Sequence, residues 1–551
     1  MARRLKHWGW GYEDEQPTPH ELRAAAEFAR ERLGFGSLEP RQPVPLSRLS
    51  LPPPRVEAPP PLAQICTSDT YERALHSYGR SYSDIVRACA GNFDHPPDVV
   101  AFPRDEPEVE ALLEWAVSAG AAVIPFGGGT SVVGGVEGTV PAAYNGILTI
   151  DLKLLDRVLE VDRTSQAARI QAGTLGPALE EQLAKHGMTL RHFPQSFQFS
   201  TLGGWIATRS GGHFATLYTH IDELVESVRA VTPRGVWESR RLPASGAGTS
   251  PDRMLIGSEG ILGVITEAWV RVRPRPAHRS SAAVQFLDFG AGVAAARAVS
   301  QSGLYPSNCR LIDADEVRVT GAGEGSYALL LLGFESAHHD VEPWMRLALA
   351  TCADQGGTWE RRGAKQRGGG AEGWRESFLR APYLRDLFVA IDVLSETFET
   401  AITWERFDIF HQSVLERTRA VVQEVCGGGT VTCRFTHVYP DGPAPYYSVL
   451  APARPGAELE QWAEIKHAAS EAVLAAGGTI THHHAVGRDH RRWYDRQRPD
   501  PFADALSAAK AALDPAGVLN PGVLIDPSPI ATPQWASRET AGPSSGRSYT
   551  R

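Results

Sequence analysis

Hydrophobic and polar positions along the chain follow two spacings, which predicts a mixture of helices and strands. From 108 to 119, Val109, Leu112 and Leu113 recur at the three- or four-residue spacing of a helix with one apolar face. A second helix is expected over 175–186, ended by Gly187. Short apolar runs predict strands at 99–102, 122–125, 147–150, 158–161 and 168–171. The pattern from 95 to 275 therefore indicates an α+β domain with short strands.

The pattern changes after residue 275 and indicates a separate domain over 276–480. Strands expected at 282–286 and 327–334 are each followed by a helix, and the second helix ends near Cys352. A polar segment with a helix follows over 481–525. Residues 1–94 are interpreted as an arm with a helix capped by Thr18 and a proline-rich extended connector. The glycine-rich segment 361–373 and the tail 526–551 are predicted to lack regular structure.

Composition excludes several classes of protein. A chain of 551 residues should hold at least two domains, and its net charge of -9 gives no electrostatic case for binding nucleic acid. Six scattered cysteines without a CxxC pair favour a reducing, intracellular setting. We find no secretory signal and no run near the roughly 20 apolar residues of a membrane-spanning helix. A cytoplasmic location is expected, with the inner membrane surface as the alternative and only peripheral membrane contact.

The first of three glycine-rich loops carries the clearest chemistry. It follows the strand at 122–125, and its consecutive glycines let backbone N–H groups converge on an anion, typically a phosphate. It is neither a GxxxxGK[ST] loop nor a GxGxxG loop opening a helix, and a flexible turn is the simpler interpretation. The candidate cofactor-binding residues here are Pro125, Phe126, Gly127, Gly128, Gly129, Thr130 and Ser131.

Two further loops are also rich in glycine. The loop at 194–208 can close over a diphosphate or a flavin ring, although Ser200 or Thr201 capping an ordinary helix is an alternative. The loop at 257–266 alternates glycine with apolar residues before a strand, so its backbone is expected to approach another group closely. The candidates in these loops are Gln195, Ser196, Phe197, Gln198, Phe199, Ser200, Thr201, Gly204, Thr208, Arg209, Ser210, Gly211, Glu259, Gly260, Ile261, Leu262, Gly263, Val264 and Ile265.

Two arginines and a pair of tyrosines stand out in the second half. Arg310 and Arg406 can bind a phosphate through two parallel hydrogen bonds. Their simpler roles are an ion pair with Asp313 for Arg310 and a surface-helix ion pair for Arg406, which follows a helix-like, Glu-rich stretch at 396–400. Tyr446 and Tyr447 fall on opposite faces of a strand, so a one-residue slip would exchange them.

Three consecutive histidines have pKa values suited to proton transfer. In an extended segment, His482 and His484 would point to one side and His483 to the other. A solvated turn is the alternative. No metal site is predicted, because we find no nearby carboxylate or cysteine to complete one.

Three such loops in this order, with the ending Leu513-Asp514-Pro515-Ala516-Gly517-Val518-Leu519-Asn520-Pro521-Gly522, resemble the FAD-binding domain of the vanillyl-alcohol oxidase flavoprotein superfamily. The segments Cys309–Asp313, Arg434–Tyr439 and Thr481–Gly487 narrow the similarity to the alkyl-dihydroxyacetone-phosphate synthase family, over roughly residues 95 to 525. The resemblance implies a two-part PCMH-type FAD-binding domain, an α/β cap domain with an antiparallel sheet, and a C-terminal helical segment returning to the FAD site.

The resemblance also implies an activity. The family exchanges the acyl group of acyl-dihydroxyacetone phosphate for a long-chain fatty alcohol through a flavin N5 adduct. It implies Arg406, with Arg310, as substrate-phosphate anchor, and Tyr446 with His482, His483 and His484 as proton-transfer groups. The expected partners are the lipid substrates, a membrane surface contacted peripherally and a second copy of the chain in a homodimer; no nucleic acid is expected. FAD is expected to be non-covalent, because the first loop contains no histidine.

Departures from the family leave the lipid substrate open. The chain has Gln195 where an acidic residue is frequent and Ala485 where glycine is usual, and a proline-rich stretch precedes Tyr446. We also expect no targeting extension of the kind that peroxisomal members carry. Two other functions remain alternatives: an FAD-dependent dehydrogenase of D-2-hydroxy acids such as lactate, glycolate or 2-hydroxyglutarate, and a non-catalytic flavin- or lipid-binding protein.

Overall fold

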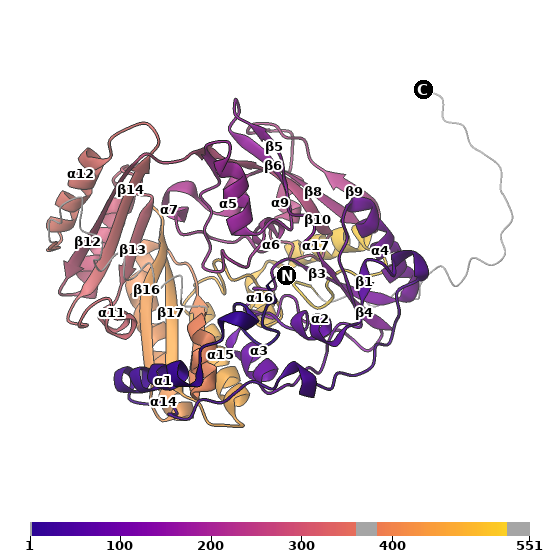
Figure 1. Cartoon of the computed structure of the whole chain (residues 1–551). Helices are drawn as coiled ribbons and strands as arrows, with labels where there is room; N and C mark the ends of the chain where they lie inside the picture. The colour runs from indigo at the N-terminus through magenta and orange to yellow at the C-terminus, as the bar shows by residue number, and fades with distance from the viewer. Residues whose placement is uncertain (1–2, 360–382, 526–551) are drawn as a thin grey trace.

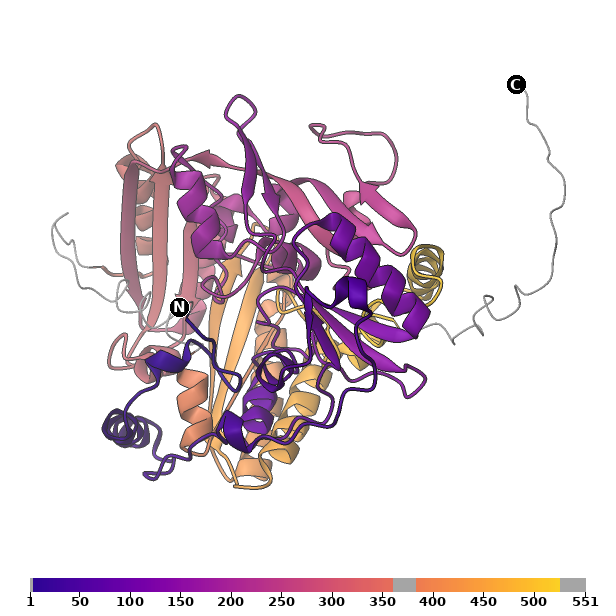
Figure 2. The same cartoon turned by 45° about the vertical axis from the view of Figure 1, so that its right-hand side comes forward.

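The computed structural model describes residues 3–359 and 383–525. Two sheets and their helices form one side of the molecule, and a larger sheet with its own helices forms the other (Figure 1). Figure 2, turned by 45°, shows the same division. The segments predicted to lack structure, 361–373 and 526–551, lie outside the described residues.

The first sheet contains the strand that leads into the first glycine loop. Its order is β1–β2–β4–β3, with β2, β4 and β3 parallel. The three parallel strands are buried along almost their whole length, as their continuous apolar runs require in a parallel sheet. The elements are β1 (Cys66–Thr67), β2 (Val99–Ala101), β3 (Ala121–Phe126), β4 (Gly146–Asp151) and the connecting helix α4 (Glu106–Ala119). The predicted helix and strands of this region are confirmed.

The second sheet is antiparallel, in the order β5–β6–β10–β8–β9. Thr201 caps the helix α6 through its hydroxyl, which accepts a hydrogen bond from the N–H of Gly204. The strands are β5 (Val158–Asp162), β6 (Ala167–Gln171), β8 (Val225–Thr232), β9 (Gly235–Glu238) and β10 (Val264–Arg271), beside the short ribbon β7 (Met188–Thr189) and β11 (Arg273–Pro274). The helices are α5 (Gly176–Ala184), α6 (Leu202–Thr208), α7 (Ala215–Tyr218), α8 (Ile221–Leu224) and α9 (Asp252–Leu255).

The cap domain is built on a six-stranded antiparallel sheet in the order β12–β14–β13–β16–β17–β15. This confirms the antiparallel sheet that the resemblance implied. The strands are β12 (His278–Phe286), β13 (Asn308–Ile312), β14 (Ala328–Ser336), β15 (Val393–Glu399), β16 (Thr430–Val438) and β17 (Pro443–Pro452). The helices are α10 (Phe289–Gln301), α11 (Ala314–Thr320), α12 (Glu342–Ala353), α14 (Phe407–Cys426) and α15 (Glu458–Ala475).

One local prediction in this domain is wrong. The Glu-rich stretch at 396–400 was expected to be helix-like, but it lies in and just after the strand β15. Leu394 and Phe398 of this strand are buried and pack in the core of the cap domain. Tertiary packing of this segment therefore overrides the helix preference of glutamate.

The terminal segments both return to the middle of the molecule. The arm carries α1 (Pro19–Leu33), with the predicted capping box at Thr18, and then α2 (Thr70–Leu75) and α3 (Tyr82–Cys89). After α16 (Arg491–Gln497) and α17 (Asp500–Leu513), the chain passes beside β3, where the N–H of Val123 donates to Val518 and the N–H of Asn520 donates to Val123. The C-terminal segment thus lies next to the first glycine loop.

Candidate active site

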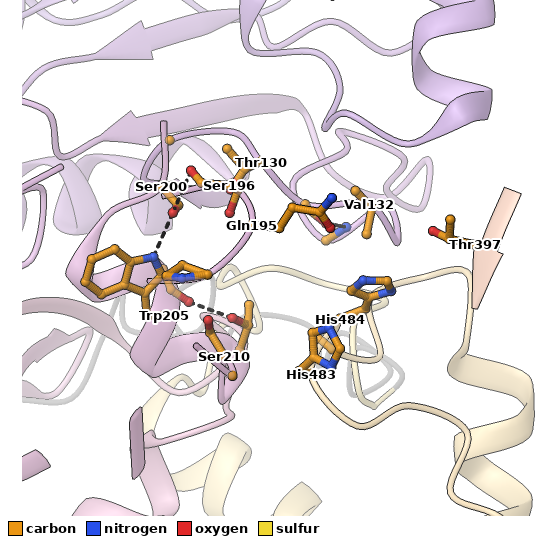
Figure 3. Close-up of a pocket in the computed structure, with 18 of the residues that line it drawn as sticks. Thr130, Val132, Gln195, Ser196, Ser200, Trp205, Ser210, Thr397, His483 and His484 are labelled. Carbon is orange, nitrogen blue, oxygen red and sulfur yellow. Dashed lines mark hydrogen bonds between the residues drawn. The ribbon is translucent and has the colours of Figure 1, made fainter. Parts of the chain in front are cut away.

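A cavity of about 640 Å³ lies between the glycine loops and the cap sheet. All three loops contribute to its wall, and residues of the cap strands β15, β16 and β17 form much of the remainder. Figure 3 shows Thr130, Gln195 and Ser196 from the first two loops on one side, with His483 and His484 across from them. A space of this size is typical of a cofactor or substrate pocket.

Close backbone contacts hold the first two loops together. A Cβ atom on Gly128 would lie 1.6 Å from the carbonyl oxygen of Phe199, so only glycine allows this approach. Among the described residues, the N–H groups from Gly127 to Val132 make no hydrogen bond to a backbone carbonyl. These free donors line the cavity beside the hydroxyls of Thr130 and Ser131, a donor set that fits a diphosphate.

The third loop is tied to the C-terminal segment. The Glu259 carboxylate accepts hydrogen bonds from the N–H groups of Val486 and Gly487, and the Asn520 amide donates to the carbonyls of Glu259 and Gly135. Burial raises the pKa of Glu259 to about 7. These contacts explain why the ending at 513–522 accompanies the glycine loops.

Most of the predicted cofactor-binding residues line the cavity. These are Pro125, Phe126, Gly127, Gly128, Gly129, Thr130, Ser131, Gln195, Ser196, Ser200, Thr201, Gly204, Thr208, Ser210, Gly211, Glu259, Gly260, Gly263 and Ile265. Seven others do not line the cavity: Phe197, Gln198, Phe199, Arg209, Ile261, Leu262 and Val264. Phe197, for example, stacks on Trp205, and Arg209 pairs with Asp222.

On the cap side, three polar residues lie in one row across neighbouring strands. Tyr446 of β17 pairs directly with Glu399 of β15 and with Arg434 of β16. The Arg434 guanidinium lies 3.9 Å from the centre of the Tyr446 ring and also binds Glu316. Tyr447 faces the opposite side of the sheet, where its hydroxyl lies 3.0 Å from Nδ1 of His411. The register therefore places Tyr446, and not Tyr447, in the cavity.

The histidine segment curls around the buried Glu399 carboxylate. This carboxylate accepts hydrogen bonds from the N–H groups of His482, His483 and His484 and from the Thr481 hydroxyl. The expected alternation of the three side chains is wrong, because the segment is bent and not extended: His483 and His484 line the cavity, while His482 lies behind them. The carboxylate that we did not find in the sequence is Glu399, 83 residues earlier.

The environment keeps these imidazoles neutral. Burial, followed by nearby His220, Arg310 and Arg434, lowers the pKa of His483 to about 3. Burial also holds the pKa values of His437, His482 and His484 well below their usual value. Burial alone would raise the pKa of Glu399, but the neighbouring histidines and the four donors lower it.

One ring nitrogen from each of His437, His482 and His483 lies within 4.8 Å of the other two, close enough for one metal ion. However, Nδ1 of His482 and Nδ1 of His483 share a hydrogen bond of 3.0 Å. His437 uses one nitrogen with the carbonyl of Gly212 and the other with the Thr436 hydroxyl. The arrangement favours a hydrogen-bonded network over a metal centre.

The two candidate phosphate-binding arginines have different positions. Arg310 is buried in β13 and lines the cavity. Arg406 is exposed and donates to the carbonyl of Ala476 just beyond α15, so the structure does not bring it into the cavity. Arg434 also lines the cavity, although the sequence predicted no role for it. The alternation of polar and apolar residues along β16 could have indicated it, because Thr430, Thr432, Arg434 and Thr436 all line the cavity. Trp10 from the N-terminal arm also lines the cavity, and no sequence pattern indicated this.

We expect Glu399→Ala to lower activity and stability without disturbing the three glycine-rich loops. Removing the carboxylate leaves four buried donors without their acceptor, at about 1.5–3 kcal/mol for each bond to a charged group. The melting temperature and kcat should both fall, while the contacts among the three glycine-rich loops stay intact. Glu405→Ala, which removes an exposed carboxylate, is the control and should change neither quantity. A Glu399→Ala protein with normal kcat would contradict the role of Glu399 in holding the histidine segment at the site.

Comparison with known proteins agrees with this geometry. Residues 97–239 match the FAD binding domain family, and residues 275–524 match the family of FAD linked oxidases, C-terminal domain. The protein is therefore a flavoprotein of the FAD-linked oxidase class, and FAD is its cofactor. The chain belongs to the alkyldihydroxyacetonephosphate synthase family: it is 31% identical to the Trypanosoma brucei brucei member over 87% of this chain and 82% of that one.

Other similarities are consistent with this family. The Caenorhabditis elegans alkyldihydroxyacetonephosphate synthase is 32% identical over 82% of this chain and 80% of its own. A solved alkyldihydroxyacetonephosphate synthase superposes with a TM-score of 0.78 at 24% identity, covering 94% of this chain and 98% of the other, and so has the same fold. An Arabidopsis thaliana mitochondrial D-lactate dehydrogenase, 26% identical over 84% of this chain and 78% of its own, is more distant.

Among the described residues, every helix is too short or too polar to cross a membrane.

Proposed function

We propose that this protein exchanges the acyl group of an acyl-dihydroxyacetone phosphate for a long-chain fatty alcohol. The products are an alkyl-dihydroxyacetone phosphate and a fatty acid. The observation that carries the proposal is the pair of Arg434 and Tyr446, which line one cavity together with the FAD loops and lie in one row with the buried Glu399. Bound FAD would supply an electron-accepting ring, and the protein would position the substrate and move protons.

The cationic groups in the cavity fit a phosphorylated substrate. Arg310 and Arg434 both line it, and arginine binds phosphate through two parallel donors. We assign the phosphate-binding role to these two residues. Hydroxyls from Thr432, Thr436 and Ser448 on the same sheet face add neutral donors.

The other part of the cavity fits hydrocarbon. Along β17, Tyr446, Ser448 and Leu450 follow one another on the face toward the cavity. Leu450 packs with Val319 and Phe388, which also line the cavity. A lactate-sized 2-hydroxy acid has no use for this apolar extension, whereas an alkyl or acyl chain would be buried there with favourable free energy.

We assign proton transfer to Tyr446, His483 and His484. Among the described residues, the Tyr446 hydroxyl has no hydrogen-bond partner, which leaves it available to substrate. The Arg434 guanidinium lies over the Tyr446 ring, 3.9 Å from its centre. The neutral rings of His483 and His484, beside Tyr446, can accept a proton from it.

Arg434→Leu and Arg406→Leu should separate the two candidate anchors. We expect Arg434→Leu to reduce kcat/KM for the phosphorylated substrate by at least about tenfold, the loss that follows from removing a charge-assisted hydrogen bond of 1.5–3 kcal/mol. Arg406→Leu, which changes an exposed side chain, should leave kcat/KM nearly unchanged. Steady-state kinetics with varied acyl substrate make the comparison. The opposite result, with Arg406 essential and Arg434 dispensable, would overturn our assignment.

The direct test of the activity uses purified holoprotein, acyl-dihydroxyacetone phosphate and a fatty alcohol. We expect an ether product and free fatty acid. Bleaching of the flavin by a D-2-hydroxy acid, without ether formation, would support the dehydrogenase instead. Protein that takes up no FAD would contradict both the synthase and the dehydrogenase activity. Peripheral membrane contact, a homodimer, a cytoplasmic location and the domain boundaries at 95, 276 and 481 remain predictions.

A further inference from the structure

Four side chains from three separate segments form a continuous hydrogen-bonded chain leading out of the cavity. Nδ1 of His483, a cavity-lining residue, lies 3.0 Å from Nδ1 of His482. Nε2 of His482 lies 3.1 Å from the Tyr439 hydroxyl, which lies 2.6 Å from Nε2 of His220. His220 is partly exposed, and its Nδ1 lies 3.3 Å from the carbonyl oxygen of the exposed residue Arg209.

We propose that His483, His482, Tyr439 and His220 form a proton relay that carries the proton released in each turnover from the cavity to solvent. This inference rests on the proposed function. In the exchange, the substrate's bond to the acyl oxygen breaks, a C–O bond to the alcohol oxygen forms, and the alcohol loses its O–H hydrogen. The fatty acid leaves as a carboxylate near neutral pH, so one proton per turnover has to reach water.

One set of tautomers satisfies every bond in the chain with neutral groups. Nδ1–H of His483 donates to Nδ1 of His482, Nε2–H of His482 donates to the Tyr439 oxygen, and the Tyr439 O–H donates to Nε2 of His220. Nδ1–H of His220 then donates to the Arg209 carbonyl. Tautomers follow from the pattern of donors and acceptors, and this pattern leaves Nε2 of His483 as the open acceptor.

Transfer along this chain conserves atoms and charge. A proton that joins Nε2 of His483 displaces the Nδ1 proton to His482, and each later hydrogen moves one bond outward. His220 receives the hydroxyl proton of Tyr439 and releases its own Nδ1 proton to water. Burial lowers the pKa values of His483, His482 and His220, so the proton does not remain on any ring.

The relay can be tested with Tyr439→Phe and His220→Asn. Tyr439→Phe removes only the bridging hydroxyl. We expect kcat to fall by about 10²-fold, the lower end of what proton-transfer groups contribute, with KM and the bound-flavin spectrum unchanged. Added imidazole should restore part of the lost kcat in both variants, and the solvent deuterium isotope effect on kcat should rise. A purely structural role would produce neither effect.

The matched controls come from the other face of the cap sheet. Tyr447 and His411 form a similar tyrosine–histidine pair, 3.0 Å apart, but neither lines the cavity. Tyr447→Phe and His411→Asn should therefore keep the wild-type kcat and show no response to imidazole. If Tyr439→Phe fails to bind flavin, His220→Asn decides the question with the same measurements.

The outcomes separate the relay from the proposed function. A wild-type protein without exchange activity would contradict the function itself. A wild-type protein that exchanges, with relay variants at normal kcat, would contradict the relay alone. A loss of kcat that imidazole does not reverse in either variant would also contradict it, because it would indicate a structural role.

Discussion

Tyr446→Phe should abolish exchange while leaving FAD bound. The variant keeps the ring over the Arg434 guanidinium and its place between Glu399 and Arg434, so the sheet is undisturbed. It loses the only hydroxyl of this row. Because a positioned proton-transfer group contributes about 10²–10⁴-fold, we expect kcat to fall by that factor.

The measurement combines the exchange assay with the visible spectrum of the purified variant. The flavin spectrum and the melting temperature should match those of the wild type. Tyr447→Phe, one residue along the strand and facing the helix α14, is the control. If Tyr446→Phe retained wild-type kcat, the tyrosine would not be the proton-transfer group, and the histidines would have to act without it.

Gly128→Ala should eliminate FAD binding. A Cβ atom at this position would lie 1.6 Å from the Phe199 carbonyl oxygen, and backbone cannot yield as a flexible side chain does. The first and second loops would have to move apart, which disperses the N–H groups that face the cavity. We expect a colourless protein, detected by flavin absorbance after purification and by titration with FAD.

The control for this variant is Gly246→Ala. Gly246 is exposed, has an ordinary backbone conformation, and has no atom within 4 Å of the position of an added Cβ. It should bind FAD as the wild type does. A yellow Gly128→Ala protein with full flavin content would show that the first loop does not form the cofactor site described above.

Much of the FAD-binding half was predictable because its signals are local. The strand β3 is a continuous apolar run that ends in three glycines, and α4 shows one clear apolar face. The capping roles of Thr18 and Thr201 also depend on residues only three positions away. Each of these features is fixed within a few residues of the chain, so a single sequence reveals it.

The cap side of the site was harder because it depends on long-range register. The row of Glu399, Tyr446 and Arg434 exists only because β15, β17 and β16 are neighbours, an arrangement that periodicity does not reveal. The bend in the histidine segment likewise depends on Glu399, 83 residues away. The relay residues Tyr439 and His220 meet across 219 residues and carried no local signal.

The measurement that tests the central claim most directly follows a labelled fatty alcohol. Holoprotein is incubated with acyl-dihydroxyacetone phosphate and hexadecanol labelled at its oxygen-bearing carbon. We predict label in a phosphorylated lipid that resists alkaline ester hydrolysis, with one fatty acid released for each label incorporated and no net reduction of FAD. Label that remains in free alcohol, together with flavin reduced by a D-2-hydroxy acid, would contradict the account.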